Sequence, residues 1–257
     1  MSTALYDRVI FGPIHSRRLG LSLGVNLLPL DHKLCSFDCI YCECGWGEKR
    51  EKVRFNDRET VRRELERKLT EMVGAGTPPD VITFAGNGEP TLHPDFGEII
   101  EDTIALRDRI APRAKVSVLS NATQIGRERV RAALLRVDNN ILKLDSAFDR
   151  TVRLVDRPRG NYSVAETVEN MKKFEGQLIV QTMFLRGEFD GKIVDNTTEE
   201  EVSAWLALIR EIAPRQVMVY TIDRSTPAEN LQKVTVEELK AIAARVEALG
   251  ITCSVAG

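Results

Sequence analysis

The chain has 257 residues, of which 43% are hydrophobic and 29% are charged, and its formal net charge is −2. No apolar run approaches the ~20 residues of a membrane span, so we expect no membrane protein. The slightly acidic balance argues against a protein whose main task is to hold nucleic-acid backbone, although a local basic patch stays compatible with it.

The first strand is predicted at residues 23–28. A helix capped by Asn56 follows, with Glu59 three residues later and an apolar stripe at helical spacing, namely Val61, Leu65, Leu69 and Met72. Three further strands are predicted at residues 81–85, 115–119 and 140–145, with helices at residues 95–110 and 126–137 between them.

The last two core strands are predicted at residues 178–184 and 216–222. Three helices are predicted to open at a Ser or Thr with Glu three residues on, the pattern of a capping box: Ser163 and Glu166, Thr197 and Glu200, Thr235 and Glu238. The last helix is predicted to end at Gly250, before a short strand at residues 251–255.

Six alternating strand–helix units predict an α/β fold with a mainly parallel sheet and right-handed crossovers. Periodicity does not separate a doubly wound open sheet from a barrel, and both place a ligand at the carboxyl ends of the strands. No linker or low-complexity run interrupts the chain, so we expect one domain over residues 1–257.

Three of the five cysteines follow the first predicted strand, Cys35, Cys39 and Cys42, with Tyr41 before the third. Three thiolates on one loop suit a 4Fe–4S cluster held by three of its irons, which leaves one iron for another ligand. The alternatives are structural zinc, with Cys44 or His32 as fourth ligand, and three free buried thiols. Clustered cysteines indicate a reducing compartment, and the start of the chain lacks the pattern of a signal peptide, so we expect a cytoplasmic protein.

The C-x3-C-x2-C spacing with its aromatic residue resembles the signature of the radical S-adenosylmethionine (radical SAM) superfamily. The resemblance implies a partial (β/α)6 barrel of the TIM type, a 4Fe–4S cluster and S-adenosylmethionine as cofactors, and a 5′-deoxyadenosyl radical that abstracts hydrogen from a substrate. It also implies a reductant such as flavodoxin or ferredoxin.

A glycine motif, Gly86-Asn87-Gly88-Glu89-Pro90, follows the second predicted strand. Glycine lets the backbone approach a ligand closely and adopt positive φ. The motif resembles the Gly-Gly-Glu type of the superfamily, which implies that it holds the amino group of S-adenosylmethionine, although Asn87 departs from the double glycine. The alternative is a tight turn between strand and helix.

Polar side chains in or at the ends of the other strands complete the predicted S-adenosylmethionine site: Ser120, Asn121, Lys143, Asp145, Gln181, Tyr220 and Thr221. Lys143 and Asp145 share one face of a strand and need water, each other or a ligand, for which the ribose hydroxyls and carboxylate would serve. The alternative is an ion pair at the barrel mouth. Tyr220 and Thr221 either flank the adenine or pack as ordinary strand residues.

Two basic groups lie beside the strands: His15, Arg17 and Arg18 before the first strand, and Arg153, Arg157 and Arg159 after the fourth. Arginine side chains suit carboxylates and phosphates, and solvated surface is the alternative. Cys44 is a further candidate for substrate contact, whereas Cys253 is expected in the core.

Residues 16–25, the Gly-Asn-Gly-Glu-Pro-Thr motif and Arg157-Pro158 resemble the wyosine-synthetase-like (tRNA-imidazoguanosine synthetase-like) subgroup. That subgroup's named members modify tRNA and bind a second cluster through upstream cysteines, whereas no cysteine precedes Cys35 here. We therefore expect a single-cluster enzyme acting on a small molecule, peptide or protein. The alternatives are a tRNA-modifying enzyme and a non-catalytic zinc-binding module.

Overall fold

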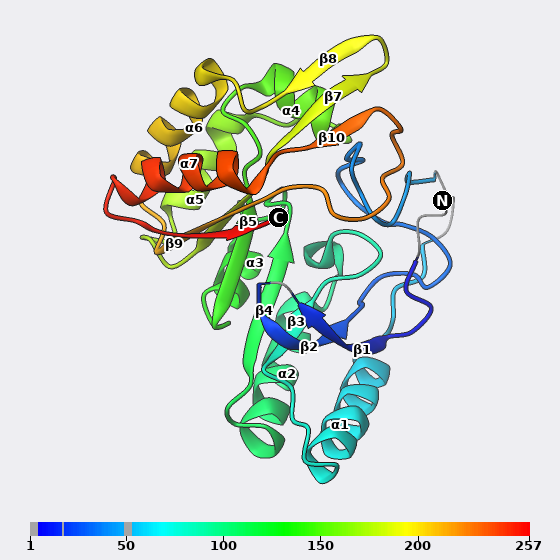
Figure 1. The fold of residues 1–257 in the computed structure, drawn as a ribbon. Coiled ribbons are helices and arrows are strands. Elements are labelled where there is room, and N and C mark those ends of the chain that lie inside the picture. The colour runs from blue at the N-terminus through cyan, green and yellow to red at the C-terminus, as the bar shows by residue number, and fades with distance from the viewer. Residues whose placement is uncertain (1–4, 17, 49–52) are drawn as a thin grey trace.

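The computed structural model describes residues 5–16, 18–48 and 53–257 (Figure 1). Its main feature is an eight-stranded sheet in the order β1-β2-β3-β4-β5-β6-β9-β11. β1 and β2 pair antiparallel, and every other neighbouring pair in this sheet is parallel. The sheet curls into a half-barrel, so the predicted partial TIM-type barrel is confirmed.

The strands of the main sheet are β1 (Ile10–Ser16), β2 (Gly20–Val25), β3 (Val81–Phe84), β4 (Lys115–Ser120), β5 (Asn139–Lys143), β6 (Ile179–Met183), β9 (Gln216–Tyr220) and β11 (Thr252–Ala256). A small antiparallel sheet holds β7 (Leu185–Phe189), β8 (Lys192–Asp195) and β10 (Leu231–Lys233). The helices are α1 (Arg58–Gly74), η1 (Pro90–Leu92), α2 (Phe96–Ile110), α3 (Glu128–Leu134), α4 (Asp149–Val155), α5 (Val164–Lys172), α6 (Glu199–Ile212) and α7 (Val236–Glu247). Among the described residues, none of the helices has the length and apolarity needed to cross a bilayer.

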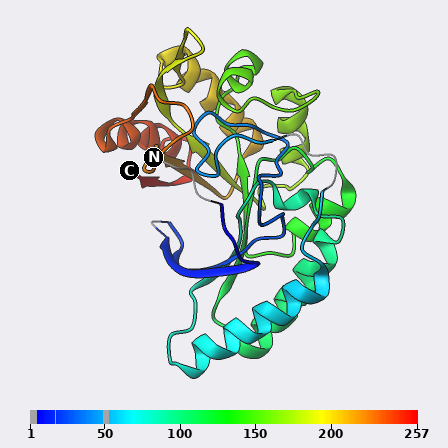
Figure 2. The same ribbon diagram turned by 90° about the vertical axis from the view of Figure 1, so that its right-hand side faces the viewer.

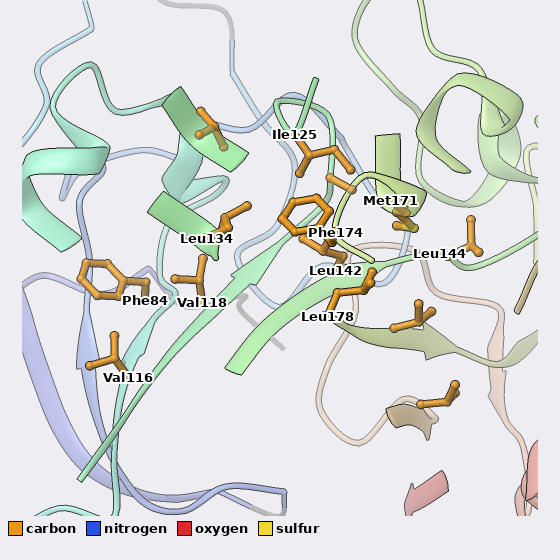
Figure 3. Close-up of a cluster of buried hydrophobic side chains, with 14 of the residues drawn as sticks. Phe84, Val116, Val118, Ile125, Leu134, Leu142, Leu144, Met171, Phe174 and Leu178 are labelled. Atoms are coloured by element: carbon orange, nitrogen blue, oxygen red, sulfur yellow. The ribbon is translucent and has the colours of Figure 1, made fainter. Parts of the chain in front are cut away.

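The larger core lies between the convex face of the sheet and the helices. Strand residues alternate between the two faces, and those on the convex face are apolar. Figure 3 shows part of this core, where Phe84, Val118 and Leu142 from three strands lie beside Leu134 and Phe174. Burial of these side chains fixes the register of the strands and therefore the position of their carboxyl ends.

A smaller apolar cluster lies on the concave face, which is the interior of the half-barrel. Ile141, Ile179 and Met218 pack there with Leu119 and with Leu19 from the β1–β2 hairpin. Although β1 lies at one edge of the sheet and β11 at the other, the tip of the hairpin therefore reaches across the concave face. Figure 2 shows the hairpin, in blue, beside the curved sheet.

Several predicted boundaries are wrong for local reasons. Asp57, not Asn56, caps α1 by accepting a hydrogen bond from the Thr60 amide, whereas the Asn56 amide donates to backbone carbonyls before the helix. Thr198, not Thr197, caps α6. The last helix ends at Glu247, three residues before the predicted stop at Gly250. The strand predicted over residues 178–184 corresponds to β6, which is one residue shorter at each end, and β7 begins beyond it.

The prediction also lacks β1, α4 and the small sheet. β1 contains Gly12-Pro13 and a register shift between Phe11 and Ile14, which interrupt the alternation that identifies a strand. The remaining missed elements are short, between three and seven residues.

The capping box of α7 gives a local test of stability. Thr235 accepts from the Glu238 amide at 3.2 Å, and the Glu238 carboxylate accepts from the Thr235 amide at 3.0 Å. A hydrogen bond from Arg186 lowers the pKa of Glu238 to about 2, so this carboxylate is ionised at neutral pH. We expect Thr235→Ala to lower the free energy of unfolding by about 1 kcal/mol in urea titrations, and Lys240→Ala on the same helix to have little effect.

Candidate active site

The loop between β2 and α1 carries the three clustered cysteines over the carboxyl ends of the strands. Together with strand-end residues it lines a pocket of about 200 Å3, hereafter the cluster pocket. Ten of the predicted site residues line it: Cys35, Cys39, Cys42, Gly86, Gly88, Glu89, Ser120, Asn121, Lys143 and Gln181. Residues of β4, β5 and β6, of the cysteine loop and of the loop after β3 thus meet at the edge where a parallel sheet places its ligands.

The sulfurs of Cys35 and Cys39 have different hydrogen-bond partners. The Sγ of Cys35 accepts from the Phe37 amide and from Nδ2 of Asn121, both at 3.4 Å. The Cys39 thiol donates to Asp156 at 3.3 Å. Hydrogen bonds to ligating sulfur are one means by which proteins set the reduction potential of a cluster.

Lys33 supplies a buried cation beside these sulfurs. Its Nζ donates to the Gly45 carbonyl at 2.9 Å and to Asp38 at 3.2 Å. Burial lowers the pKa of Lys33, but the charges of Cys42 and Cys35 outweigh this effect and raise it above its usual value. The ammonium group therefore offsets negative charge gathered by the cysteine loop.

The Cys44 side chain lies outside the cluster pocket, unlike those of the three predicted cluster ligands. Its thiol donates to the Gly86 carbonyl at 3.2 Å and to the Cys42 sulfur, which lowers the pKa of Cys42 to about 6 and raises that of Cys44. Cys44 does not line the cluster pocket, but it lines an adjoining cavity of about 830 Å3, hereafter the barrel cavity. A protonated Cys44 suits the prediction that it is not a cluster ligand.

The geometry does not suit a single zinc ion. Within residues 5–16, 18–48 and 53–257, no three His, Cys, Asp or Glu side chains are arranged to hold one ion. Structural zinc needs four ligands within about 2.3 Å of one point. A four-iron cube is larger, so its ligands need not meet at one point, and a cluster on the three cysteines stays a prediction.

Gly88 brings the glycine motif against the cysteine loop. Its φ is +138°, and a Cβ there would lie 1.8 Å from the Leu34 carbonyl oxygen. The Leu34 amide donates to the Asn87 carbonyl at 2.8 Å, and the Leu34 carbonyl accepts from the Glu89 amide at 3.0 Å. The motif therefore supports the loop as well as lining the cluster pocket.

Two motif residues lie behind the pocket. The Asn87 side chain accepts from the Tyr6 amide at 2.8 Å and donates to the carbonyls of Tyr6 and Pro29. Pro90 begins η1 and is buried. Neither side chain lines the pocket in this structure, and their predicted role in cofactor binding stays a prediction.

Glu89 joins the motif to the end of β4. Its buried carboxylate accepts from Ser120 Oγ at 2.9 Å, from the Asn121 amide at 2.6 Å and from the Thr91 amide at 3.1 Å. Burial raises the pKa of Glu89, against these hydrogen bonds. The Asn121 side chain also donates to Ser36 at 2.9 Å, so the same group of residues positions the cysteine loop.

Lys143 and Asp145 form an ion pair, which was one of the two roles considered for them from the sequence. Their charged atoms lie 3.3 Å apart, and the Tyr41 hydroxyl hydrogen-bonds both groups. Asp145 is buried behind the pocket and also accepts from the Met183 amide at 3.0 Å, whereas Lys143 lines the pocket. The pair thus holds Lys143 at the pocket wall, where contact with a bound molecule stays a prediction.

Substitution of Lys143 tests how much this buried ion pair contributes to the free energy of unfolding. Lys143→Met leaves Asp145 without its cation, and we expect the free energy of unfolding to fall by about 3 kcal/mol. Lys192→Met removes an exposed lysine from β8 and serves as the control, for which a change within ~0.5 kcal/mol is expected. Equal values for the two variants in urea titrations would show that the ion pair does not stabilise the fold.

Gln181 and Tyr220 line the barrel cavity, and Thr221 does not. The Thr221 hydroxyl accepts from the Val234 amide at 2.9 Å, and its amide donates to the Ala256 carbonyl at 3.3 Å. Because neighbouring residues of a strand face opposite ways, Tyr220 faces the cavity and Thr221 faces away from it.

The basic groups are dispersed. Arg17 lies outside the described residues, whereas His15 and Arg18 line the barrel cavity. Arg153 and Arg159 donate to backbone carbonyls, and the guanidinium of Arg157 lies 4.8 Å from the ring of Trp46. Arg153 and Arg157 line one cavity that does not include Arg159, and an anion-binding role for these arginines stays a prediction.

Two residues of the site have no sequence signal of their own. Lys33 resembles any surface lysine until burial beside the cysteines is known. Asp156 comes directly after α4 and meets Cys39 only through the fold, 117 residues away in sequence. Burial raises the pKa of Asp156 to about 8, and the neighbouring Asp145 charge adds to this effect.

Comparisons with known proteins agree with this geometry. The model of the radical SAM superfamily matches residues 32–197. The UPF0026 protein MJ1312 of Methanocaldococcus jannaschii is 30% identical over 242 residues, which cover 92% of this chain and 70% of that protein. Among its curated relatives, the chain spans from 33% to 77% of the relative's own length.

Solved structures agree on the fold. A radical SAM methyltransferase from Sphaerobacter thermophilus has a TM-score of 0.69 at 14% identity, over 91% of this chain and 65% of that one. TYW1 with a lysine-pyruvate adduct bound has a TM-score of 0.60 at 14% identity, over 88% of this chain and 73% of that one. These likenesses show the fold alone, whereas the family match covers more than half of the sequence. The chain therefore belongs to the radical SAM superfamily and is a radical SAM enzyme.

Proposed function

We propose that this enzyme holds one 4Fe–4S cluster on Cys35, Cys39 and Cys42 and cleaves S-adenosylmethionine reductively. The observation that carries the proposal is the cluster pocket, where these cysteines face Gly88 and Glu89 of the glycine motif. When bound, the two cofactors supply a 5′-deoxyadenosyl radical that removes a hydrogen atom from the substrate.

The protein groups bind and orient the cofactors. Gly86 and Gly88 allow close approach of the backbone, and the buried Glu89 carboxylate faces a positively charged amino group. Lys143 suits the carboxylate of the same ligand. On this proposal Ser120 and Asn121 of the cluster pocket and Tyr220 of the barrel cavity contact the adenosyl part, and Gln181 lies where the pocket meets the cavity. Asn87, Pro90, Asp145 and Thr221 support those residues from behind.

A low-potential electron carrier such as flavodoxin or ferredoxin is the proposed reductant, and the cytoplasm is the proposed location. Cluster potentials span about −700 to +450 mV, and a sulfonium, which is hard to reduce, requires a value near the low end. The proposed substrate is a small molecule, because the barrel cavity of about 830 Å3 beside the cluster pocket falls within the range of small-molecule sites.

Anaerobic reconstitution followed by iron, sulfide and zinc analysis tests the proposal. We expect about four irons per chain and release of 5′-deoxyadenosine when S-adenosylmethionine and dithionite are added. One zinc per chain without iron would overturn the proposal in favour of a zinc-binding module. Salt-sensitive retention of tRNA by the reconstituted enzyme would favour the tRNA-modifying alternative over a small-molecule substrate.

A further inference from the structure

The barrel cavity adjoins the proposed cofactor site and is much larger. It shares Tyr41, Cys42 and Gln181 with the wall of the cluster pocket. Its other wall comes from the β1–β2 hairpin, whose tip reaches across the concave face of the sheet to β9 (Figure 2). A molecule bound there lies within the half-barrel and next to the proposed radical source.

Two residues that line this cavity each carry a buried polar atom without a partner within the described residues. The side chain of Gln181 is nine-tenths buried, and its Oε1 accepts no hydrogen bond. Nη1 of Arg18 is also buried and donates none. A buried polar group without a partner costs free energy, so one acceptor and one donor here indicate a ligand that satisfies both.

Arg18 is held against an aromatic ring and not by a carboxylate. Its guanidinium carbon lies 4.6 Å from the centre of the Tyr220 ring, and the amides of Arg18 and Leu19 donate to Ser16 Oγ at 3.3 and 3.2 Å. Stacking on an aromatic ring orients a guanidinium and leaves its edge available for hydrogen bonds. Arg18 is therefore oriented before any ligand binds.

Arg224, which also lines the cavity, differs from Arg18 in having a carboxylate partner. Arg224 donates to Glu43 at 2.7 Å, so its charge is already compensated by a carboxylate. Lys233 pairs with Asp223 at 3.3 Å near the same wall. Of the two arginines that the structure describes in the wall of this cavity, Arg18 is therefore the one whose charge no described carboxylate compensates.

We propose that Arg18 and Gln181 form the substrate subsite, which takes a small molecule carrying a carboxylate or phosphate next to a hydroxyl or amino group. The anionic group pairs with the Arg18 guanidinium, and the hydroxyl or amine donates to Oε1 of Gln181. This inference rests on the proposed function, because it names the substrate class of the same site.

Nuclear magnetic resonance on the anaerobically reconstituted enzyme, with S-adenosylmethionine added, tests the subsite. The probes are inorganic phosphate, followed by 31P line broadening, and glycolate, followed by 1H saturation transfer. We expect at least one probe to bind, and the better-bound probe then identifies phosphate or carboxylate as the anionic group. Arg18→Met should weaken its binding by ~10-fold or more, with Arg18→Lys intermediate. Arg153→Met removes the same charge outside the cavity and should leave binding unchanged.

Absence of binding by either probe, or equal binding by Arg18→Met and Arg153→Met, would overturn the inference. Gln181→Leu adds a second measurement, since it should weaken glycolate more than phosphate, and equal effects on both would contradict the role of Gln181. Release of 5′-deoxyadenosine by the unaltered enzyme is measured on the same samples. Its absence, with Arg18-dependent probe binding intact, would overturn the proposed function and leave the anion subsite standing.

Discussion

Cys39→Ala should abolish both iron binding and reductive cleavage of S-adenosylmethionine. Three cysteines are the minimum ligand set for the proposed cluster, and Cys39 is buried beside Asp156, where no other described cysteine replaces its sulfur. We expect the iron content after reconstitution to fall from about four per chain to near zero. We also expect 5′-deoxyadenosine release under dithionite to fall to the level seen without enzyme.

Two other cysteines provide matched controls for this result. Cys44 lies on the same loop but lines the barrel cavity, and Cys253 packs against the core on β11. Cys44→Ala and Cys253→Ala should each retain about four irons and 5′-deoxyadenosine release. Loss of iron in Cys44→Ala to the same extent as in Cys39→Ala would identify Cys44 as a fourth ligand and contradict the open iron.

Gly88→Ala should lower stability and cofactor binding together. A Cβ at this position meets the Leu34 carbonyl group at 1.8 Å, and φ is +138°, a conformation that residues with a side chain rarely adopt. We expect the free energy of unfolding of the apoprotein to fall by about 2–4 kcal/mol in urea titrations. Displacement of the cysteine loop should also weaken S-adenosylmethionine binding by the reconstituted enzyme, measured by equilibrium dialysis.

Gly74→Ala at the end of α1 is the control for this substitution. A Cβ there meets no atom within 4 Å, so the change should be neutral or stabilising by up to about 1 kcal/mol. If Gly88→Ala were as stable as Gly74→Ala and bound the cofactor normally, close contact between the motif and the cysteine loop would not be required.

The position of much of the site was predictable because the carboxyl ends of parallel strands lie at one edge of the sheet. The order of strands and helices predicts that Gly88, Glu89, Asn121 and Lys143 lie at the same edge as the cysteines, the family resemblance singles out the glycine motif, and the structure brings all four to one pocket. The wyosine-synthetase-like subgroup stays a prediction, since the structural likeness to TYW1 shows the fold alone.

What the sequence did not reveal depends on side-chain direction and on contacts distant in the chain. Tyr220 and Thr221 look equivalent as polar residues at a strand end, but the alternation of a strand lets one face the cavity. Asn87 lies within a ligand-binding motif, yet its side chain is directed toward Tyr6 and Pro29. Lys33 and Asp156 acquire their roles by burial, which no local pattern predicted here.

The hairpin that crosses the concave face joins the beginning of the chain to its last third. Arg18 rests on Tyr220, so the wall of the cavity exists only after more than 200 residues have been synthesised and folded. During synthesis, therefore, the cysteine loop leaves the ribosome well before Tyr220, which is needed to complete the wall of the barrel cavity.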